Sequence, residues 1–388
     1  MSASTPTVAP CMDAYDIAIV GAGPAGAVSA WLLAQSRPNL RIVLCDAETE
    51  PRHRPCGEYL APGGLGVLDR AGLLDAVVAT GAFRLDAVAL CGPSGGPAIP
   101  FKPVLGLHPP VDHGLGVRRE RFDKVLQDHA GSVCELRRNC RIRGVDRLPT
   151  GWQLVDHQGR QLVTRLLVGA DGRGSIVRRA CGLDRRPSRQ RFALVTRATG
   201  VDHGTTVEMH LGPLGQIGLC PLGGGEVNLN VLLAPGARKL LRCLTPDRLL
   251  RAALAATRVL AGRTRHARLG LVMATGSLPQ GCRTVAADGA ALVGDASGFC
   301  DPFTGEGMSL ALRSAELFAA ALAADRGLSG YAADFHRSIG RRRVIGEALQ
   351  GLLSRRRLSE GVAGVLARLP LLGRLLVADA AGYQRGSA

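Results

Sequence analysis

A glycine-rich turn between two short apolar stretches constrains the fold of this chain more than any other feature. Residues 15–20 read Tyr-Asp-Ile-Ala-Ile-Val, which is typical of a buried strand, and residues 21–26 read Gly-Ala-Gly-Pro-Ala-Gly. Residues 27–35 favour a helix, and a second apolar stretch, residues 41–45, ends at Asp46. This order of strand, Gly-x-Gly-x-x-Gly turn, helix and strand predicts a βαβ unit of a parallel sheet.

The glycines of this turn have separate physical roles in binding a dinucleotide. Gly21 permits a tight turn, Gly23 lets the backbone approach a pyrophosphate, and Gly26 lets helix and strand pack closely. The free N–H groups and the dipole of the helix N-terminus attract phosphates, and Asp46 would accept hydrogen bonds from the ribose hydroxyls. A glycine turn in an ordinary βαβ unit is the alternative. The binding residues predicted here are Gly21, Gly23, Pro24, Ala25, Gly26 and Asp46.

Composition indicates a globular protein in a reducing compartment. The chain has 388 residues, 46% hydrophobic and 21% charged, enough for two or three domains' worth of core or one composite fold. No apolar run is long enough for a membrane span and the N-terminus does not resemble a signal peptide, so we expect a cytoplasmic protein. Eleven scattered cysteines without a Cys-x-x-Cys pair argue against disulfides and zinc, and we expect no metal.

The formal net charge of +16 raises nucleic acid as a partner. However, the arginines are dispersed, no nucleic-acid-binding module is recognisable, and aromatic residues make up only 4% of the chain. We therefore expect no nucleic-acid binding. A basic surface that meets anionic lipid or acidic proteins is left open.

Two more glycine-containing turns follow predicted strands. Residues 161–168 lead into Gly169-Ala170-Asp171-Gly172, and residues 290–293 lead into Gly294-Asp295. Taken alone, Asp171 reads as a turn residue and Asp295 as a helix N-cap. A dinucleotide needs only the first turn, so three such turns in order favour a longer cofactor with several polar segments. FAD fits this requirement.

At these turns the sequence resembles the FAD-dependent oxidoreductase superfamily of p-hydroxybenzoate-hydroxylase-like monooxygenases and geranylgeranyl-reductase-like flavoproteins. The resemblance covers about residues 14–325. It implies that Asp171 supports the pyrophosphate region and that Asp295, beside Gly294, binds the ribityl hydroxyls. It also identifies Arg119 as the arginine that faces the cofactor at the start of a helix.

The expected fold is α/β: a doubly wound, Rossmann-type FAD-binding domain with an inserted, mostly antiparallel substrate domain and a helical C-terminal tail. Within it, we expect residues 64–78 to form one helix, and Thr245 to cap another that begins at Pro246. The predicted boundaries are 14–82, 114–182 and 286–328 for the FAD-binding domain, 83–113 and 183–285 for the substrate domain, and 329–388 for the tail.

Residues 301–307, Asp-Pro-Phe-Thr-Gly-Glu-Gly, open a long predicted helix. Its N-terminal N–H groups would point at the pyrimidine end of the flavin, where a positive dipole stabilises negative charge. Gly305, Glu306 and Gly307 are therefore predicted to contact the cofactor. For Glu306 we favour a carboxylate at the helix start over a general base.

Residues 54–62 carry a Cys-Gly-Glu sequence that resembles the geranylgeranyl-reductase-like subgroup. The resemblance implies that this loop lies at the active face of the flavin, with Arg54, Cys56 and Gly57 near the cofactor. Cys56 and Glu58 are the candidate catalytic residues, with Cys56 as a weak acid or a substrate contact. A small residue packed in a tight turn is the alternative reading of Cys56.

The substrate side departs from prenyl reductases, which carry an aromatic-rich strand. Here residues 216–222 and 227–230 are small and apolar, with no aromatic wall. This argues against a geranylgeranyl chain and favours the monooxygenase, but it is compatible with a hydrophobic small molecule. Asn228 and Asn230 would share one strand face, where they could orient a substrate or serve as edge partners. For His210, the nearest histidine, we favour a core or surface residue over a general base.

The reaction is open at this stage. The leading hypothesis is a monooxygenase of an aromatic or polyketide-type substrate; a C=C reductase and a non-catalytic FAD-binding protein are the alternatives. The chain has no second complete Gly-x-Gly-x-x-Gly unit, so NAD(P)H would bind transiently, and a separate protein donor is the other option. The arginine-rich tail predicts either a packed helix with solvated arginines or a peripheral membrane contact.

Overall fold

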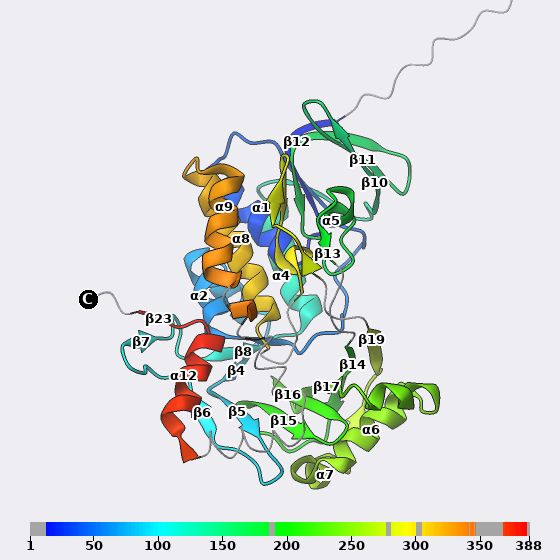
Figure 1. Ribbon diagram of the computed structural model, residues 1–388, viewed down its shortest axis with the longest axis vertical. Helices are drawn as coiled ribbons and strands as arrows, with labels where there is room; N and C mark the ends of the chain where they lie inside the picture. Colours follow the sequence, from blue (N-terminus) through cyan, green and yellow to red (C-terminus); the bar gives the residue numbers. More distant parts are fainter. Residues whose placement is uncertain are drawn as a thin grey trace, which may run out of the picture.

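The computed structural model describes residues 13–185, 191–276, 281–299, 305–340, 342–344, 346 and 368–385. Two sheets dominate it (Figure 1), one with helices α1, α4, α8 and α9 around it and one with α6 and α7 against it. The predicted α/β fold with a Rossmann-type parallel sheet is confirmed.

The first sheet has a parallel core in the order β9-β2-β1-β12-β22. A hairpin, β10 (Ile142–Leu148) and β11 (Gly151–Asp156), adds antiparallel strands beside β12. Val20 pairs with Gly169, and Gly169 pairs with Leu292. Since parallel strands end at the same sheet edge, the three glycine turns begin side by side. The core strands are β1 (Asp13–Val20), β2 (Ile42–Cys45), β9 (Glu135–Arg137), β12 (Gln161–Gly169) and β22 (Ala290–Leu292).

Both faces of this sheet are buried, as expected of a parallel sheet. Side chains of β1 alternate: Ile17 and Ile19 pack with the helices, whereas Ala18 and Val20 pack into a second cluster under the hairpin. The helices on the first face are α1 (Pro24–Ser36), α4 (Arg119–Gly131), α8 (Gly307–Ala323) and α9 (Gly327–Phe335), and α5 (Ile176–Ala180) contributes to the second cluster.

The second sheet runs β18-β14-β17-β16-β15-β5-β6, with β19 also pairing with β14. Its pairs are antiparallel except β15 with β5. Its strands are β5 (Ala87–Cys91), β6 (Ala98–Pro100), β14 (Phe192–Thr199), β15 (Thr206–Gly212), β16 (Gly215–Gly223), β17 (Glu226–Leu233), β18 (Arg268–Leu269) and β19 (Met273–Gly276).

Helices α6 (Pro246–Ala256) and α7 (Arg258–Thr264) share a core with the second sheet. As predicted, Thr245 caps α6: its side chain accepts a hydrogen bond from the N–H of Arg248, 3.4 Å away. A 3-10 helix, η1 (Ala237–Arg242), precedes α6.

A third, small sheet has the strand order β3 (Tyr59–Leu60), β8 (Gly114–Gly116) and β4 (Phe83–Leu85). Two helices, α2 (Pro62–Arg70) and α3 (Leu74–Val78), lie between β3 and β4 in the sequence. The prediction of one helix over residues 64–78 was wrong. Gly72 has a φ of +68°, a left-handed conformation that ends α2 and separates it from α3. The apolar side chains of the two helices still share the first core.

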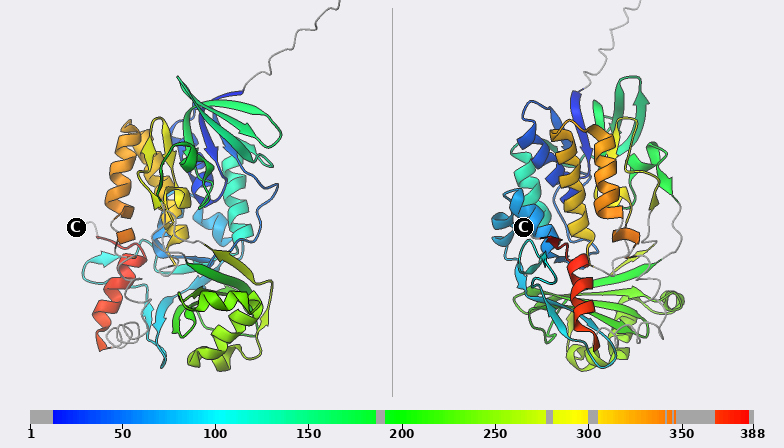
Figure 2. Two further views of the ribbon diagram at one scale, coloured as in Figure 1. Left: turned by 45° about the vertical axis from the view of Figure 1, so that its right-hand side comes forward. Right: turned by 60° about the vertical axis from the view of Figure 1, so that its left-hand side comes forward.

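Near the C-terminus, α12 (Pro370–Ala380) lies beside β6, and β23 (Gln384–Arg385) pairs with β7 (Leu107–His108). Figure 1 and the left-hand view of Figure 2 show α12 to the side of the second sheet, next to its edge strand β6. None of the helices in the described ranges combines the length and the hydropathy needed to cross a bilayer. The remaining short elements are β13 (Asp184–Arg185), β20 (Gly281–Cys282), β21 (Ala286–Ala287), η2 (Gly294–Ser297) and the π-helical turn η4 (His336–Gly340).

Candidate active site

The three glycine turns pack directly against one another. A Cβ atom on Gly21 would lie 2.5 Å from the carbonyl oxygen of Ala170, and one on Gly26 would lie 1.9 Å from the oxygen of Gly21. At Gly294, a Cβ would lie 2.8 Å from the Cβ of Ala25. These glycines are therefore required by close backbone approach, and they join the first turn to the second and third.

Other glycines of the turns face open space. No atom lies within 4 Å of a Cβ built on Gly23 or Gly307. Gly23 is the N-cap of α1 and Gly307 is the first residue of α8, and neither helix start has a side-chain cap. Two helix N-termini with free N–H groups and adjacent space suit phosphates at one end and a flavin at the other.

Asp46 is buried at the end of β2 and stabilises the first turn. Its Oδ2 accepts a hydrogen bond from the N–H of Ala22 at 2.8 Å, and its Oδ1 accepts one from the N–H of Glu48 at 2.9 Å. Each oxygen keeps a second lone pair, so ribose hydroxyls could still donate to it. Gln127 of α4 also supports the turn by donating from Nε2 to the oxygen of Ala22, at 3.0 Å.

Asp171 in the second turn has one oxygen paired and one without a partner. Its Oδ2 accepts from the N–H groups of Ile176 at 2.7 Å and Val177 at 3.4 Å, at the start of α5. Its Oδ1 is buried and has no hydrogen-bond partner among the described residues. Burial raises the pKa of Asp171. A buried acceptor of this kind fits a cofactor hydroxyl or a bound water.

Asp295 in the third turn is partly exposed, on η2. Burial raises the pKa of its carboxyl group, although arginines around it act in the opposite direction. The neighbouring Gly294 lies against Ala25 near the start of α1, and a carboxylate at this end of the sheet matches what ribityl hydroxyls would require. The residues present therefore fit FAD. The arginines that act on Asp295 are Arg173, Arg119, Arg343 and Arg178.

Two of these arginines fasten the turns together. Arg178 is 1% exposed and donates to the carbonyl oxygens of Arg173, at 2.6 Å, and Ala296, at 3.0 Å. Arg343, from the C-terminal segment, donates to the oxygen of Ser297 at 2.7 Å. These roles of Arg178 and Arg343 were not predicted from the sequence, because no local pattern distinguishes the two residues from the many other arginines.

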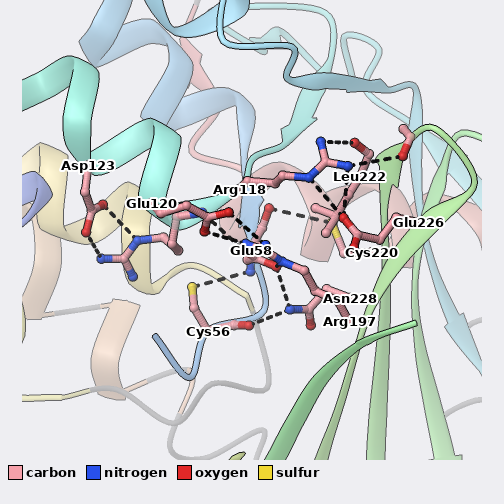
Figure 3. A network of polar contacts seen from close by, with 12 residues as sticks. Cys56, Glu58, Arg118, Glu120, Asp123, Arg197, Cys220, Leu222, Glu226 and Asn228 are labelled. Carbon is pink, nitrogen blue, oxygen red and sulfur yellow. Dashed lines mark hydrogen bonds and ion pairs between the residues drawn. The ribbon is translucent and has the colours of Figure 1, made fainter. Parts of the chain in front are cut away.

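The Cys-Gly-Glu loop is held by a buried ionic network (Figure 3). Glu58 is fully buried, and its Oε1 accepts from the backbone N–H of Arg119 at 3.0 Å. Its Oε2 accepts from Arg197 Nε at 2.9 Å and from Asn228 Nδ2 at 3.0 Å. A second, shorter contact joins Arg197 to Oε1. Because both of its carboxylate oxygens accept hydrogen bonds, Glu58 acts here as a positioning residue for the loop.

Cys56 lies next to Arg119 and is held from three directions. Its Sγ accepts the N–H of Glu58 at 3.4 Å, and its carbonyl oxygen accepts Asn228 Nδ2 at 2.8 Å. Burial raises the pKa of the Cys56 thiol, and the guanidinium of Arg119 partly opposes this effect. The thiol is therefore protonated at neutral pH. Arg119 also forms a bidentate pair with Asp123, at 2.8 and 2.9 Å.

Ion pairs fasten this loop and helix α4 to the second sheet. Arg197 of β14 pairs with Glu120 of α4 as well as with Glu58, with 2.8 Å between its Nη1 and Glu120 Oε1. Arg118 donates from Nε to Glu226 Oε2 at 3.0 Å and from Nη1 to the oxygen of Leu222 at 3.2 Å. The site thus lies where the two sheets meet, and its geometry depends on both.

The other predicted site residues lie around the same junction. Arg54 and Gly57 are half-buried, and a Cβ on Gly57 would lie 3.5 Å from Asn230 Nδ2. Gly305 has a φ of +67°, and a Cβ there would lie 2.8 Å from the ring of Tyr59. Glu306 is the buried N-cap residue of α8, as predicted, and lies 3.9 Å from Arg342. Residues 301–304 lie outside the described residues.

Two clusters in the described chain have metal-ligating atoms close together, but arginine already neutralises their carboxylates. Arg197 pairs with Glu58 and Glu120, and Arg263 pairs with Glu208 at 2.8 Å. His210 is buried on β15 and contacts Glu208 at 2.6 Å, so the interpretation as a core histidine is confirmed. The clusters are His53 with Glu58 and Glu120, and Cys91 with Glu208 and His210.

Residues 14–334 match the family model described as FAD binding domain. The chain belongs to this FAD-binding family. The family match covers the three turns and the Cys-Gly-Glu loop, and it agrees with a site whose residues fit FAD.

Several relatives of this FAD-binding chain are enzymes. It is 25% identical over 315 residues to a digeranylgeranylglycerophospholipid reductase of Methanococcus vannielii, covering 77% of this chain and 74% of the relative. It is 28% identical over 335 residues to a menaquinone reductase of Mycolicibacterium smegmatis, covering 81% and 78%. A rifampicin monooxygenase of Streptomyces venezuelae is 28% identical over 170 residues, covering 44% and 34%.

Among solved structures, a flavoprotein/dehydrogenase from Cytophaga hutchinsonii superposes with a TM-score of 0.77 at 22% identity, covering 92% of this chain and 93% of that one. At this identity the similarity concerns the fold alone. Together, the family and the enzyme relatives identify the chain as a FAD-dependent oxidoreductase.

Proposed function

We propose that this FAD-dependent oxidoreductase reduces a carbon–carbon double bond of a hydrophobic small molecule. The observation that carries the proposal is the position of the Cys56 thiol, held by Asn228 and Glu58 in a loop that the buried Glu58 carboxylate joins to Arg119. Reduction of C=C needs a proton donor at a defined position in addition to the reductant. The bound FAD supplies the two-electron chemistry, and the chain's own residues supply the proton and its position.

Cys56 would give that proton to the substrate carbon as the C–H bond forms, and water would return a proton to the thiolate afterwards. Because burial raises its pKa, the sulfur holds its proton at neutral pH. After donation, the thiolate at Sγ keeps the N–H of Glu58 as a hydrogen-bond donor and the guanidinium of Arg119 as a nearby positive charge. Positioned proton transfer of this kind typically contributes a factor of about 10²–10⁴ to the rate.

Two observations support a lipophilic substrate. The β16 residues from Gly215 to Leu222 are buried and, apart from Gln216, small or apolar, without aromatic side chains. In addition, the names of two relatives specify reductases of a phospholipid and of menaquinone. A lipophilic substrate is consistent with both. The electron donor, NAD(P)H or a separate protein, is part of the same proposal.

A monooxygenase acting on an aromatic or polyketide-type substrate is the second candidate, and the similarity to a rifampicin monooxygenase over 44% of the chain favours it. This reaction also uses bound FAD, but it consumes O₂ and has no need of a thiol proton at Cys56. The two candidates therefore differ in their dependence on oxygen and on this side chain.

The test is a single-turnover experiment with the purified FAD-loaded protein, reduced chemically under anaerobic conditions. Polyprenyl compounds and a menaquinone analogue serve as acceptors, and mass spectrometry follows the product. Reoxidation of the flavin without O₂, with a product that gains two hydrogen atoms at a prenyl C=C bond and keeps them after the quinone ring is reoxidised in air, supports the reductase. A product that contains ¹⁸O from labelled O₂, with no anaerobic turnover, contradicts it and supports the monooxygenase.

A further inference from the structure

An exposed apolar patch lies at the start of α12, away from the glycine turns. Leu369, Leu371 and Leu372 are 55%, 48% and 41% exposed, and Leu105, in the loop between β6 and β7, is 71% exposed. These four residues define the α12 patch. The other large apolar side chains exposed in the described ranges are scattered, so this concentration is specific to one place.

Two segments that are distant in sequence build the patch together. Arg374 of α12 donates to the carbonyl oxygen of Pro103 at 2.7 Å, which ties the helix to the loop that carries Leu105. A Cβ on Gly373 would lie 3.0 Å from Ile99 of β6. The ribbon views show α12 beside β6 at the edge of the molecule (Figures 1 and 2). The leucines are therefore carried on an anchored helix and loop.

The charges around the patch are positive. Lys102 and Arg368 are exposed beside it, and Arg374 is half-buried. Residues 87–111 and 368–378 contain no aspartate or glutamate, and the nearest acidic residue on α12 is Asp379, at the far end of the helix. A second copy of this chain would bring two sets of these cations together without acidic partners, so self-association through the patch is unfavourable.

We propose that the α12 patch docks on the surface of a bilayer that contains anionic lipids. Exposed leucines at a helix start would enter the interfacial region, while Lys102 and Arg368 would meet lipid phosphates. Each basic residue near such a surface contributes about a fivefold gain in affinity, equivalent to about 1 kcal/mol. The opposite side of α12 packs through Ala378 into the cluster that contains Tyr59 of the site loop.

This arrangement gives the docking a consequence for the substrate. The cluster that Ala378 shares with Tyr59 connects the helix that carries the patch to the strand that follows the Cys56 loop. If the proposed reduction of a lipophilic molecule is correct, docking places the site next to the phase that holds its substrate. Docking itself does not depend on that reaction, because it follows from the leucines and their basic neighbours.

The experiment is co-sedimentation of the full-length, FAD-loaded protein with vesicles. We expect the protein to bind vesicles of phosphatidylcholine with phosphatidylglycerol at least tenfold more tightly than vesicles of phosphatidylcholine alone, and to release as salt rises. The double substitution Leu371→Glu and Leu372→Glu should weaken binding tenfold or more. The control is Leu271→Glu, at an 85% exposed leucine between β18 and β19 of the second sheet, which should bind as the unchanged protein does.

Flavin content and thermal unfolding of each variant show that it is folded. No binding to either vesicle, or equal binding by the double variant and the Leu271→Glu control, would overturn the proposal. Light scattering without lipid provides a further outcome: a dimer that the double variant converts to a monomer would assign the patch to self-association instead. Activity on a water-soluble acceptor separates this test from that of the proposed reaction.

Discussion

Replacing Glu58 with glutamine tests whether the buried network positions the Cys56 loop. The glutamine keeps the size of the side chain but removes the charge that faces Arg197. Its amide nitrogen is a donor, so it cannot accept the hydrogen bonds that Arg197 and Asn228 give to the carboxylate. Breaking a buried ion pair costs about 3–5 kcal/mol. Because Arg197 keeps Glu120 as a partner, we expect a loss of about 3 kcal/mol in the free energy of unfolding.

The matched control is Glu120→Gln, since Glu120 pairs with the same guanidinium but is 29% exposed at its side chain. A more exposed partner should cost about 1 kcal/mol or less. Urea unfolding followed by flavin fluorescence and circular dichroism gives both values. Turnover of Glu58→Gln should fall by about 10²-fold, with FAD still bound, because the Cys56 loop loses its fixed geometry.

Glu58 does not position the Cys56 loop if the two glutamine variants shift the unfolding curve equally and keep equal turnover. Equal effects would mean that the buried carboxylate contributes no more than its exposed counterpart.

Three further predictions follow from the site and from the second sheet. Cys56→Ser should lower reductive turnover about 10²-fold or more with FAD retained, and wild-type turnover should persist above the ordinary thiol pKa in a pH profile, because burial raises the pKa of Cys56. Gly23→Ala should leave the apoprotein folded but weaken FAD binding about tenfold in a fluorescence titration, whereas Gly26→Ala should destabilise the apoprotein, since its Cβ would lie 1.9 Å from a backbone oxygen. Burial alone would raise the pKa of Glu208, but hydrogen bonds from His210 and Arg263 lower it to about 2; stability should therefore be lost as pH falls from about 4.5 to about 2, and Glu208→Gln should remove that loss from acid-unfolding curves.

The sequence predicted the parts of the site that depend on backbone geometry. A turn that needs glycine, followed by a helix, has a local signature, and the common edge of parallel strands then brings Asp46, Asp171 and Asp295 to one region. The cap at Thr245 was predictable for the same reason, since its partner lies three residues away. The helix break at Gly72 was missed because the apolar spacing on both sides continues across it.

The side chains that fasten the turns and the loop could not be predicted, because their partners are far away in sequence. Gln127 reaches Ala22 across 105 residues, Arg197 reaches Glu58 across 139, and Arg178 reaches Ala296 across 118. A sequence with 48 lysines and arginines offers no sign of which ones are buried. Their role is apparent only when the strands are in register.

The network also explains why the identity of the cofactor and the reaction can be encoded in different parts of the chain. The glycine turns that fit FAD belong to the first sheet, but Cys56 receives its position from Glu58, Asn228 and, through Glu58, Arg197. Asn228 and Arg197 both belong to the second sheet, where they pair across neighbouring strands. Substitutions in that sheet would therefore move the proposed proton donor without altering the glycine turns. A family that keeps one cofactor site can thereby support different reactions by altering the sheet that packs against it.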